Sequence, residues 1–502
     1  MKSERDTFVL YVSGVMTMSR LSGAGTLELS LSEIIFVEKV LRIQPNVKRL
    51  FLLLRAADSN SATQRLRNEV IEKEVFRVLR ERHGFSFDSF IWDKVTPVPG
   101  DIACENLGVK DSYLREEICR EIDIVVNIAA TTNFDERYDV ALGINTLGAK
   151  HVLDFAKKCP KLQMLLHVST AYVSGEKEGL IIEKPFYMGE TLNGTPVLDM
   201  EVELKLAEER LNELRSEEAT EEAEGVAMKE MGIQRARLNG WPNTYVFTKA
   251  MGEMVLGHLR NNIPLVIIRP TIITSTYREP FPGWVEGVRT VDSFIVAYGK
   301  GKSTCFLGDP ESIIDAKITQ IPGDMVVNSM IVAMVAHANQ PGEFIYQVGS
   351  SARNPMKIGM LPGVGYRYFS QNPWISKDGK PIKVRKATLL NTVASFRRFM
   401  AIHYILPLKG LIVVNMVFCQ YFRNVYNDHN RKIQYAMRLV ELYNPYLFFN
   451  GVFDDLNSEK LRIAVRENGV ETDMFYFDPT CIDWDDYFMN IHIPGLVRYV
   501  FK

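Results

Sequence analysis

The feature that most constrains the fold is an alternation, from residue 34 onward, of short apolar runs with stretches of helical periodicity. Each run is nearly continuous in apolar residues and is followed by polar or turn residues, as expected of a strand buried on both faces. Such alternation indicates βαβ units, in which helices cover both faces of a parallel sheet. We therefore predict a doubly wound α/β fold, whose clearest strands are residues 50–54, 122–128, 164–168 and 265–268.

The first apolar run, residues 8–16 (FVLYVSGVM), allows two interpretations. Because Lys2 and Arg5 precede it, the run loosely resembles the apolar part of a secretory signal. Glu4 and Asp6 disturb the positive charge that such a signal carries. We therefore predict a first buried β-strand.

A chain of 502 residues exceeds what one compact core usually holds, so we expect two structural units. Residues 1–375 carry the alternating pattern, interrupted at residues 176–240 by a charged, helix-favouring insertion. The acidic stretch 217–224 of this insertion is expected to be solvated. From residue 376 the alternation fades, and we predict a smaller, mainly α C-terminal unit over residues 376–502.

Composition argues against several classes of function. The 59 Lys and Arg nearly cancel the 61 Asp and Glu, so no field of one sign would attract nucleic acid. The six cysteines form no C-x-x-C pair and the eight histidines form no H-x-x-x-H pair, so we expect neither a disulfide framework nor a metal site. A reducing compartment fits best.

Residues 404–422 are the most apolar stretch elsewhere in the chain, but Lys409, Asn415 and Gln420 interrupt them. A membrane-spanning helix needs about 20 mostly apolar residues, so we predict a buried core helix instead. An amphipathic helix lying on a membrane is the alternative. Peripheral membrane association therefore stays open, as do the oligomeric state and the choice between cytoplasm and endoplasmic reticulum.

The most informative chemical pattern is Tyr245-Val-Phe-Thr-Lys249. A spacing of four residues puts the phenol and the ammonium on one helical face, where the cation favours the phenolate and lowers the tyrosine pKa. This arrangement would prepare the phenol as a proton donor. A chance surface pair is the alternative, because Y-x-x-x-K alone is a weak signal.

Neighbouring segments give this pair a context. Ser169 and Thr170 end a predicted strand, where open α/β sheets bind ligands, and their hydroxyls would hold a carbonyl oxygen. Ala129 and Ala130 end another strand and would let a cofactor pack against the backbone. Asn145 would hold a proton-relay water or kink its helix, although a local cap is an equally economical role.

Together, VSTAYVSG at 168–175, Y-x-x-x-K at 245–249 and RP at 269–270 resemble the extended short-chain dehydrogenase/reductases. Further segments are similar to the alcohol-forming fatty acyl-CoA reductases of plants, and this similarity runs from about residue 34 to residue 502. These segments are FVEK at 36–39, LLLR at 52–55, RPTIITST at 269–276, PFPGW at 280–284, FDDL at 453–456 and WDDYFMNIHIPG at 484–495.

The resemblance implies a Rossmann-type enzyme that uses NADPH to reduce a long-chain acyl-CoA to an aldehyde and then to a primary alcohol, releasing coenzyme A. It implies that Tyr245 donates a proton to the developing alkoxide and that Thr170 or Ser169 orients that oxygen. Lys249 would support Tyr245 and the nicotinamide ribose. No cysteine is required for an acyl-enzyme.

Arg55 closes the second predicted strand, where a guanidinium suits the 2′-phosphate of NADPH. The alternative is an arginine that simply reaches solvent. By resemblance, Asp101 and Ile102 would border the adenine ring. The full set of predicted cofactor-binding residues is Arg55, Asp101, Ile102, Ala129, Ala130, Lys249, Pro270, Gly23 and Gly25.

The glycine loop between the first strand and the first helix departs from the family pattern. Gly23 and Gly25 are not spaced as G-x-x-G-x-x-G, and the family spacing instead reaches Leu27, Ser30 and Glu33. Ser30 and Glu33 match a capping box, which puts a carboxylate at the helix end meant for a phosphate. At about 5 Å and an effective dielectric near 20, that repulsion costs about 3 kcal/mol. Either the first segment is altered or cofactor affinity is weakened.

Two alternatives to the reductase therefore stay open. One is a cofactor-poor relative that acts as a lipid-binding or partner subunit, and the other is a different extended short-chain reductase. For the acyl chain we expect an apolar tunnel near residues 404–421, with an ordinary aromatic core as the alternative interpretation.

Overall fold

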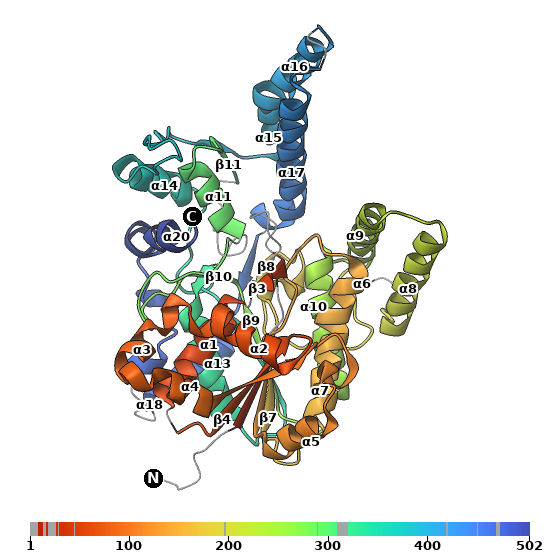
Figure 1. The fold of residues 1–502 in the computed structure, drawn as a ribbon, viewed down its shortest axis with the longest axis vertical. Helices are drawn as coiled ribbons and strands as arrows, with labels where there is room; N and C mark the ends of the chain where they lie inside the picture. Colours follow the sequence, from red (N-terminus) through yellow and green to blue (C-terminus); the bar gives the residue numbers. More distant parts are fainter. Residues whose placement is uncertain are drawn as a thin grey trace.

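The computed structural model describes the chain in segments, which are residues 9–13, 17–18, 27–28, 30–44, 46–194, 197–288, 290–308, 320–417, 420–448, 450–467 and 472–501. Its centre is a seven-stranded parallel sheet of order β13-β9-β7-β6-β1-β4-β5 (Figure 1). The strands are β1 (Val9–Ser13), β4 (Arg49–Arg55), β5 (Val95–Gly100), β6 (Ile124–Asn127), β7 (Met164–Val168), β9 (Leu265–Pro270) and β13 (Glu343–Val348).

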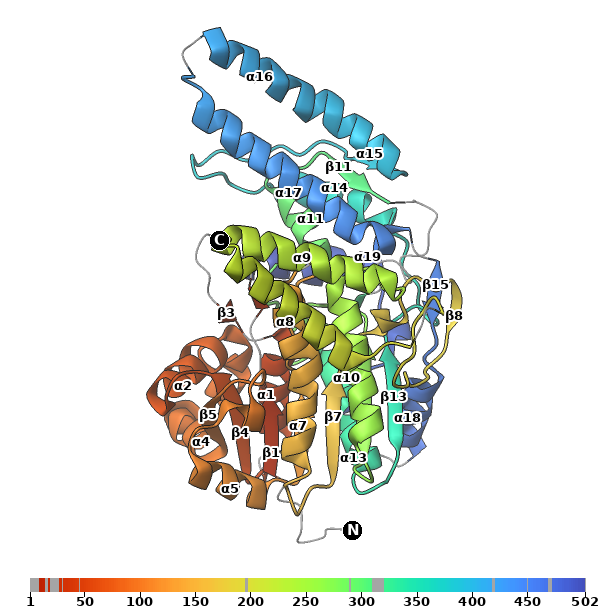
Figure 2. The ribbon, with the colours of Figure 1, turned by 90° about the vertical axis from the view of Figure 1, so that its right-hand side faces the viewer.

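Helices cover both faces of this sheet, which confirms the predicted doubly wound fold (Figure 2). Leu50, Leu52 and Leu54 belong to one buried core, whereas Phe51 and Leu53 belong to the other. This alternation explains why the strand is continuously apolar in sequence. The first core includes α1 (Leu31–Ile43) and α13 (Gly323–His337), and the second includes α5 (Ser112–Glu121), α7 (Gly148–Ala156) and α10 (Thr244–Leu259).

The order of the strands indicates at which edge of the sheet a ligand would bind. β1 lies between β4 and β6, so the predicted first strand is confirmed over residues 9–13. The chain first builds outward from β1 to β4 and β5, and then returns to the other side of β1 with β6. Open parallel sheets bind ligands at such a reversal, outside the carboxyl ends of the strands.

The predicted insertion consists mainly of two helices, α8 (Met200–Ser216) and α9 (Glu221–Leu238), which pack together beside α10 (Figure 2). Thr220 caps α9, because its side chain accepts a hydrogen bond from the backbone of Ala223. Tyr138 donates to Glu203 at 2.6 Å, and Arg235 forms an ion pair with the same carboxylate. These contacts join the insertion to α6 (Tyr138–Ala141).

A helical hairpin projects away from the sheet in the C-terminal part of the chain (Figures 1 and 2). Its first arm, Val393–Val417, is a continuous helix made of α15 (Val393–Met400), η7 (Ala401–Ile405) and α16 (Leu406–Val417). Its second arm is α17 (Arg423–Leu447). Among the helices of the described ranges, only the first arm is long and apolar enough to cross a membrane, with a mean hydropathy of 1.6.

The prediction of a buried core helix over residues 404–422 is wrong. Only 17% of the most apolar window of the first arm is buried, because α17 covers one side and no other described segment covers the opposite side. Tyr421 is 81% exposed and Val417 is 72% exposed. These side chains line neither the expected acyl tunnel nor an aromatic core.

After the hairpin, the chain returns to the sheet. β15 (Gly451–Phe453) pairs in parallel with β8 (Gly179–Ile181), and α18 (Leu456–Glu467) packs against α13. Near the C-terminus, His492 Nε2 lies 2.9 Å from Asp292 Oδ1, and Nδ1 lies 3.0 Å from Ser275 Oγ. These buried contacts join the last segment of the chain to residues 275 and 292 of the preceding part.

The remaining connections complete the fold. Between β4 and β5 lie α2 (Ser59–Leu66), η1 (Arg67–Ile71), η2 (Glu74–Phe76), α3 (Arg77–His83), η3 (Gly84–Ser86) and α4 (Phe87–Lys94). Further two-stranded pairs are β2 (Thr17–Met18) with β3 (Leu27–Glu28), β10 (Ile272–Thr274) with β12 (Gln320–Pro322), and β11 (Cys305–Leu307) with β14 (Thr388–Leu390). The other helices include α11 (Thr290–Gly299), α14 (Met360–Gln371), α19 (Trp484–Asp486) and α20 (Ile493–Tyr499).

Candidate active site

The helix that carries the Tyr-Lys pair begins at a firm cap. Asn243 accepts a hydrogen bond at Oδ1 from the backbone of Val246, at 3.2 Å, and starts α10. Tyr245 lies in the first turn and is half-buried, and Lys249 follows one turn later and is fully buried. The structure therefore places both residues on one helix at the carboxyl edge of the sheet.

Lys249 is held by the end of β7. Its Nζ donates to the backbone carbonyl of Val168 at 2.7 Å and lies 3.3 Å from His167 Nε2. Burial lowers the pKa of Lys249 to about 8, against an opposing effect of Glu253. A buried ammonium needs acceptors; the carbonyl supplies one, and the imidazole supplies another in the tautomer that carries its hydrogen on Nδ1.

His167 is a neutral partner for that ammonium. Burial, with the charge of Lys249, holds the pKa of His167 well below its ordinary value. Its other ring nitrogen, Nδ1, lies 3.1 Å from the side-chain amide of Asn127 at the end of β6. Asn127, His167 and Lys249 thus form a buried polar row beneath α10.

The two predicted hydroxyls differ in their surroundings. Ser169 Oγ is buried and makes no hydrogen bond to another described residue. Thr170 Oγ1 instead accepts a long contact, 3.4 Å, from the backbone of Tyr172 and caps the turn η6 (Ala171–Ser174). An orphaned buried hydroxyl at the carboxyl edge fits a ligand oxygen.

Asn145 connects two walls of the site. Its Oδ1 accepts from the backbone of Thr131 at 3.0 Å, and its Nδ2 donates to Thr248 Oγ1 on α10 at 3.0 Å. It lies inside η5 (Leu142–Leu147), a π-helical turn, and is not a local cap. The predicted distortion of the helix is therefore present, and the amide braces the loop after β6.

Gly252 permits this close packing. A Cβ at Gly252 would lie 2.4 Å from the backbone oxygen of Asn145, a distance that real Cβ atoms do not reach. Only glycine lets α10 approach η5 so closely, and this approach sets the position of Lys249 one turn earlier.

An aromatic cluster that the sequence analysis did not identify reaches Tyr245 through Phe134. Phe134 stacks on Tyr245 with ring centroids 5.6 Å apart, and it also contacts Tyr443 and Tyr446 at 5.2 Å. Tyr446 is buried and its hydroxyl accepts from Asn243 Nδ2 at 2.7 Å. Burial raises the pKa of Tyr446 well above its ordinary value. The end of α17 thus forms part of the site, about two hundred residues away in sequence.

The structure places only some of the predicted cofactor residues at the carboxyl edge of the sheet. Arg55 ends β4 with its side chain 52% exposed, and its Nε pairs with Asp101 Oδ2 at 2.9 Å. Ala130 is half-buried near the start of the loop that follows β6, while Ala129 and Pro270 are buried. Ile102 is 1% exposed and belongs to the second core, and its place beside the adenine ring stays a prediction.

The capping box predicted at the start of α1 is present. The backbone of Ser30 donates to Glu33 Oε2 at 2.7 Å, and Ser30 Oγ accepts from the backbone of Glu33 at 3.4 Å. α1 follows β1, so this is the helix end that faces a dinucleotide in such folds. Gly23 and Gly25 lie outside the described residues.

The carboxyl edge nevertheless fits a nicotinamide cofactor. It offers an exposed guanidinium at Arg55, a small half-buried side chain at Ala130, and an orphaned hydroxyl at Ser169. These groups follow β4, β6 and β7, which flank the reversal of strand order.

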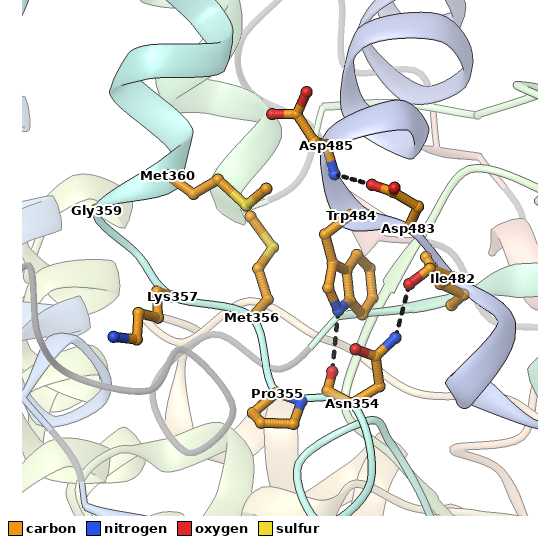
Figure 3. A pocket seen from close by; sticks show the side chains of 10 residues that line it. All are labelled: Asn354, Pro355, Met356, Lys357, Gly359, Met360, Ile482, Asp483, Trp484 and Asp485. Carbon is orange, nitrogen blue, oxygen red and sulfur yellow. Dashed lines mark hydrogen bonds between the residues drawn. The ribbon is translucent and has the colours of Figure 1, made fainter.

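A separate cavity of about 750 Å³ opens beyond the carboxyl end of β13 (Figure 3). Trp484 faces Met356 and Met360 across it, and the indole donates to the backbone oxygen of Asn354 at 2.9 Å. Asn354 Nδ2 donates to the backbone oxygen of Ile482 at 2.7 Å. None of the lining residues belongs to the predicted catalytic set.

Comparison with known proteins places the chain in a family. Two models described as male sterility protein match residues 34–330 and 403–502. The alcohol-forming fatty acyl-CoA reductase of Simmondsia chinensis is 59% identical over 468 residues, which cover 93% of this chain and 94% of the relative. Fatty acyl-CoA reductase 1 of Arabidopsis thaliana is 55% identical over 471 residues, with 93% and 95% covered.

A solved structure supports the fold alone. The reductase domain of a non-ribosomal peptide synthetase from Mycobacterium tuberculosis superposes with a TM-score of 0.56 at 17% identity, covering 98% of this chain and 92% of that domain. The resemblance seen in the sequence is confirmed by the family models and the close relatives. The chain belongs to the fatty acyl-CoA reductase family and carries its nicotinamide-cofactor domain.

Proposed function

We propose that the protein reduces long-chain fatty acyl-CoA to a primary alcohol through an aldehyde, with NADPH as reductant and coenzyme A as leaving group. The observation that carries this proposal is the placement of Tyr245, Lys249 and the orphaned Ser169 hydroxyl at the carboxyl edge of the sheet. Family membership supports the substrate class, because the similar relatives are named fatty acyl-CoA reductases.

The chain's own residues would perform the proton chemistry. A bound nicotinamide would supply the hydride that the carbonyl carbon accepts. Ser169 Oγ, with Thr170 beside it, would orient the carbonyl oxygen, and the Tyr245 hydroxyl would donate a proton to that oxygen. The new hydroxyl would then return its proton to Tyr245 as the C–S bond breaks and the thiolate of coenzyme A leaves, and the same residues would serve reduction of the aldehyde. Lys249, charged below its pKa of about 8, supports the phenol electrostatically.

We attribute a preference for NADPH over NADH to Arg55. The guanidinium ends β4 and is half-exposed, so a 2′-phosphate can approach it. Asp101 holds it in place and also competes with the phosphate for it. The proposed cofactor and catalytic residues lie in residues 1–375, and the aromatic wall comes from residues 376–502.

One observation favours a second candidate. The capping box at Ser30 and Glu33 puts a carboxylate at the dinucleotide end of α1, as expected of a cofactor-poor relative that binds lipid without reducing it. The two candidates differ in whether the protein binds NADPH and makes alcohol.

The deciding experiment supplies purified protein with a long-chain acyl-CoA and NADPH and measures the fatty alcohol formed. Alcohol and free coenzyme A in equal amounts, with two NADPH consumed for each, are expected. In one parallel reaction NADH replaces NADPH, and in another a nucleotide sugar replaces the acyl-CoA. Binding of acyl-CoA without NADPH binding or alcohol would instead establish the cofactor-poor candidate.

A further inference from the structure

The hairpin presents apolar side chains to solvent at its far end. We define the hairpin tip by five residues that are exposed there, which are Val413, Val414, Met416, Val417 and Tyr421. Met416 is 77% exposed and Tyr421 is 81% exposed. Large apolar side chains that are exposed together in this way favour an interaction site, since soluble proteins rarely leave extended apolar surface uncovered.

The two arms pack against each other, so each buries its inner apolar side chains without a further helix. Leu408 and Asn415 of α16 are buried, as are Ile433 and Val440 of α17. Asn415 Oδ1 accepts from the backbone of Phe422 at 2.7 Å and so links the end of the first arm to the start of the second. The exposed tip is therefore an outer face of a packed unit.

Positive charge flanks the tip. Residues 376–432 contain eleven exposed Lys and Arg but only two acidic residues, although the whole chain carries a net charge of -2. Four of the basic residues lie on the tip half of the arms, which are Lys409, Arg423, Arg431 and Lys432, the last paired with Asp428. The other seven lie before or within α15, at the opposite end of the first arm.

The charges also set how deeply the tip can enter a lipid layer. Lys409 precedes the end of α16 by about 12 Å along the helix, and Arg431 follows the start of α17 by about the same distance. Interfacial helices bury their apolar faces about 5–10 Å deep, with basic side chains left at the head groups. A spanning arrangement would instead drag the charges of α17 through the hydrocarbon.

We propose that the hairpin tip inserts shallowly into an anionic lipid surface and that the basic side chains beside it bind its head groups. α17 continues from this tip to Tyr446, which packs against Phe134, the ring that stacks on Tyr245 in the candidate active site. Docking would therefore hold that site within about 37 Å, the length of α17, of the lipid surface. The docking itself does not depend on the proposed activity.

The test is flotation of the full-length protein with vesicles of phosphatidylcholine, with and without phosphatidylserine. We expect the wild type to float with the phosphatidylserine vesicles, and raised salt to weaken this binding. The variant Met416→Asp/Val417→Asp should bind about tenfold more weakly or less, because it puts carboxylates where apolar side chains enter the lipid. The variant Lys409→Glu/Arg431→Glu should lose the preference for phosphatidylserine.

The matched control is Val197→Asp/Val335→Asp, since both valines are 78% exposed and lie outside the hairpin. It should bind as the wild type does, and circular dichroism should show all variants folded. Wild-type protein that fails to float, or a tip variant that floats equally well, would overturn the proposal. So would lipid-independent dimers that the tip variant abolishes while flotation persists. Reductase activity of the tip variant without vesicles should equal that of the wild type; if both lack activity, the proposed function fails and not the docking.

Discussion

The buried ammonium of Lys249 shows what the sequence could and could not predict at the scale of single residues. The placement of Tyr245 and Lys249 on one helical face could be predicted, because four residues make about one helical turn. The contact of Lys249 with His167 could not be predicted, because His167 lies on a strand and meets Lys249 only after the helix packs against the sheet. The carbonyl of Val168 carries no sequence signal at all.

The pH dependence of turnover tests this buried row. Activity should fall as pH rises through about 8, because Lys249 then loses the proton that supports the phenol. In His167→Leu the ammonium loses one acceptor and becomes harder to keep charged, so this alkaline limb should move to lower pH. His167→Gln, which keeps an acceptor, should restore the limb. A His167→Leu enzyme with an unmoved limb would show that the histidine is only structural.

Cofactor choice should depend on Arg55. Replacing it with alanine removes a charge-assisted contact of about 1.5–3 kcal/mol, so the KM for NADPH should rise about 10- to 100-fold. The KM for NADH, which lacks the 2′-phosphate, should hardly change. Arg67→Ala is the control, because that arginine is similarly exposed and paired with Glu72. An equal loss for both cofactors would refute the assignment.

At the scale of elements, α1 is well formed but unusual for a dinucleotide site. Its cap was predictable because Ser30 and Glu33 have the spacing of a reciprocal capping box. Glu33→Gln keeps that box and removes the charge, so NADPH should bind more tightly, by up to about two orders of magnitude. Equilibrium titration measures the gain. Unchanged affinity would mean that the carboxylate does not face the cofactor.

Packing between α10 and η5 gives a second test at this scale. Gly252→Ala should destabilise the protein by about 1–3 kcal/mol, because the new methyl meets the backbone of Asn145. Gly225→Ala in α9 is the matched control, since a Cβ there meets nothing within 4 Å and alanine favours helix by about 1 kcal/mol. Urea unfolding of both variants measures the difference. Equal stability changes would contradict the close approach.

At the scale of the whole molecule, the sheet was predictable and the hairpin was not. Strands buried on both faces leave continuous apolar runs, so the order of βαβ units could be inferred from residue 34 onward. An apolar helix, in contrast, has the same sequence whether a third layer covers it or solvent does. Their sequence alone therefore predicts a core position for residues 404–422, whereas the structure places them on a projecting arm.

The contact of the C-terminal part with Phe134, beside Tyr245, was also not predictable from the sequence. Tyr443 and Tyr446 reach Phe134 because β15 and α18 bring the chain back to the sheet after the hairpin. No local pattern in residues 400–446 specifies such a long-range contact. The C-terminal part is thus a wall of the candidate site as well as the carrier of the hairpin.

The most direct measurement of the central claim compares fatty alcohol formation by the wild type and by Tyr245→Phe, with NADPH binding measured for both. Removing the donating hydroxyl should lower turnover about 100-fold or more, while NADPH affinity stays the same. Alcohol formed at an undiminished rate by Tyr245→Phe would contradict the role of this phenol as the proton donor.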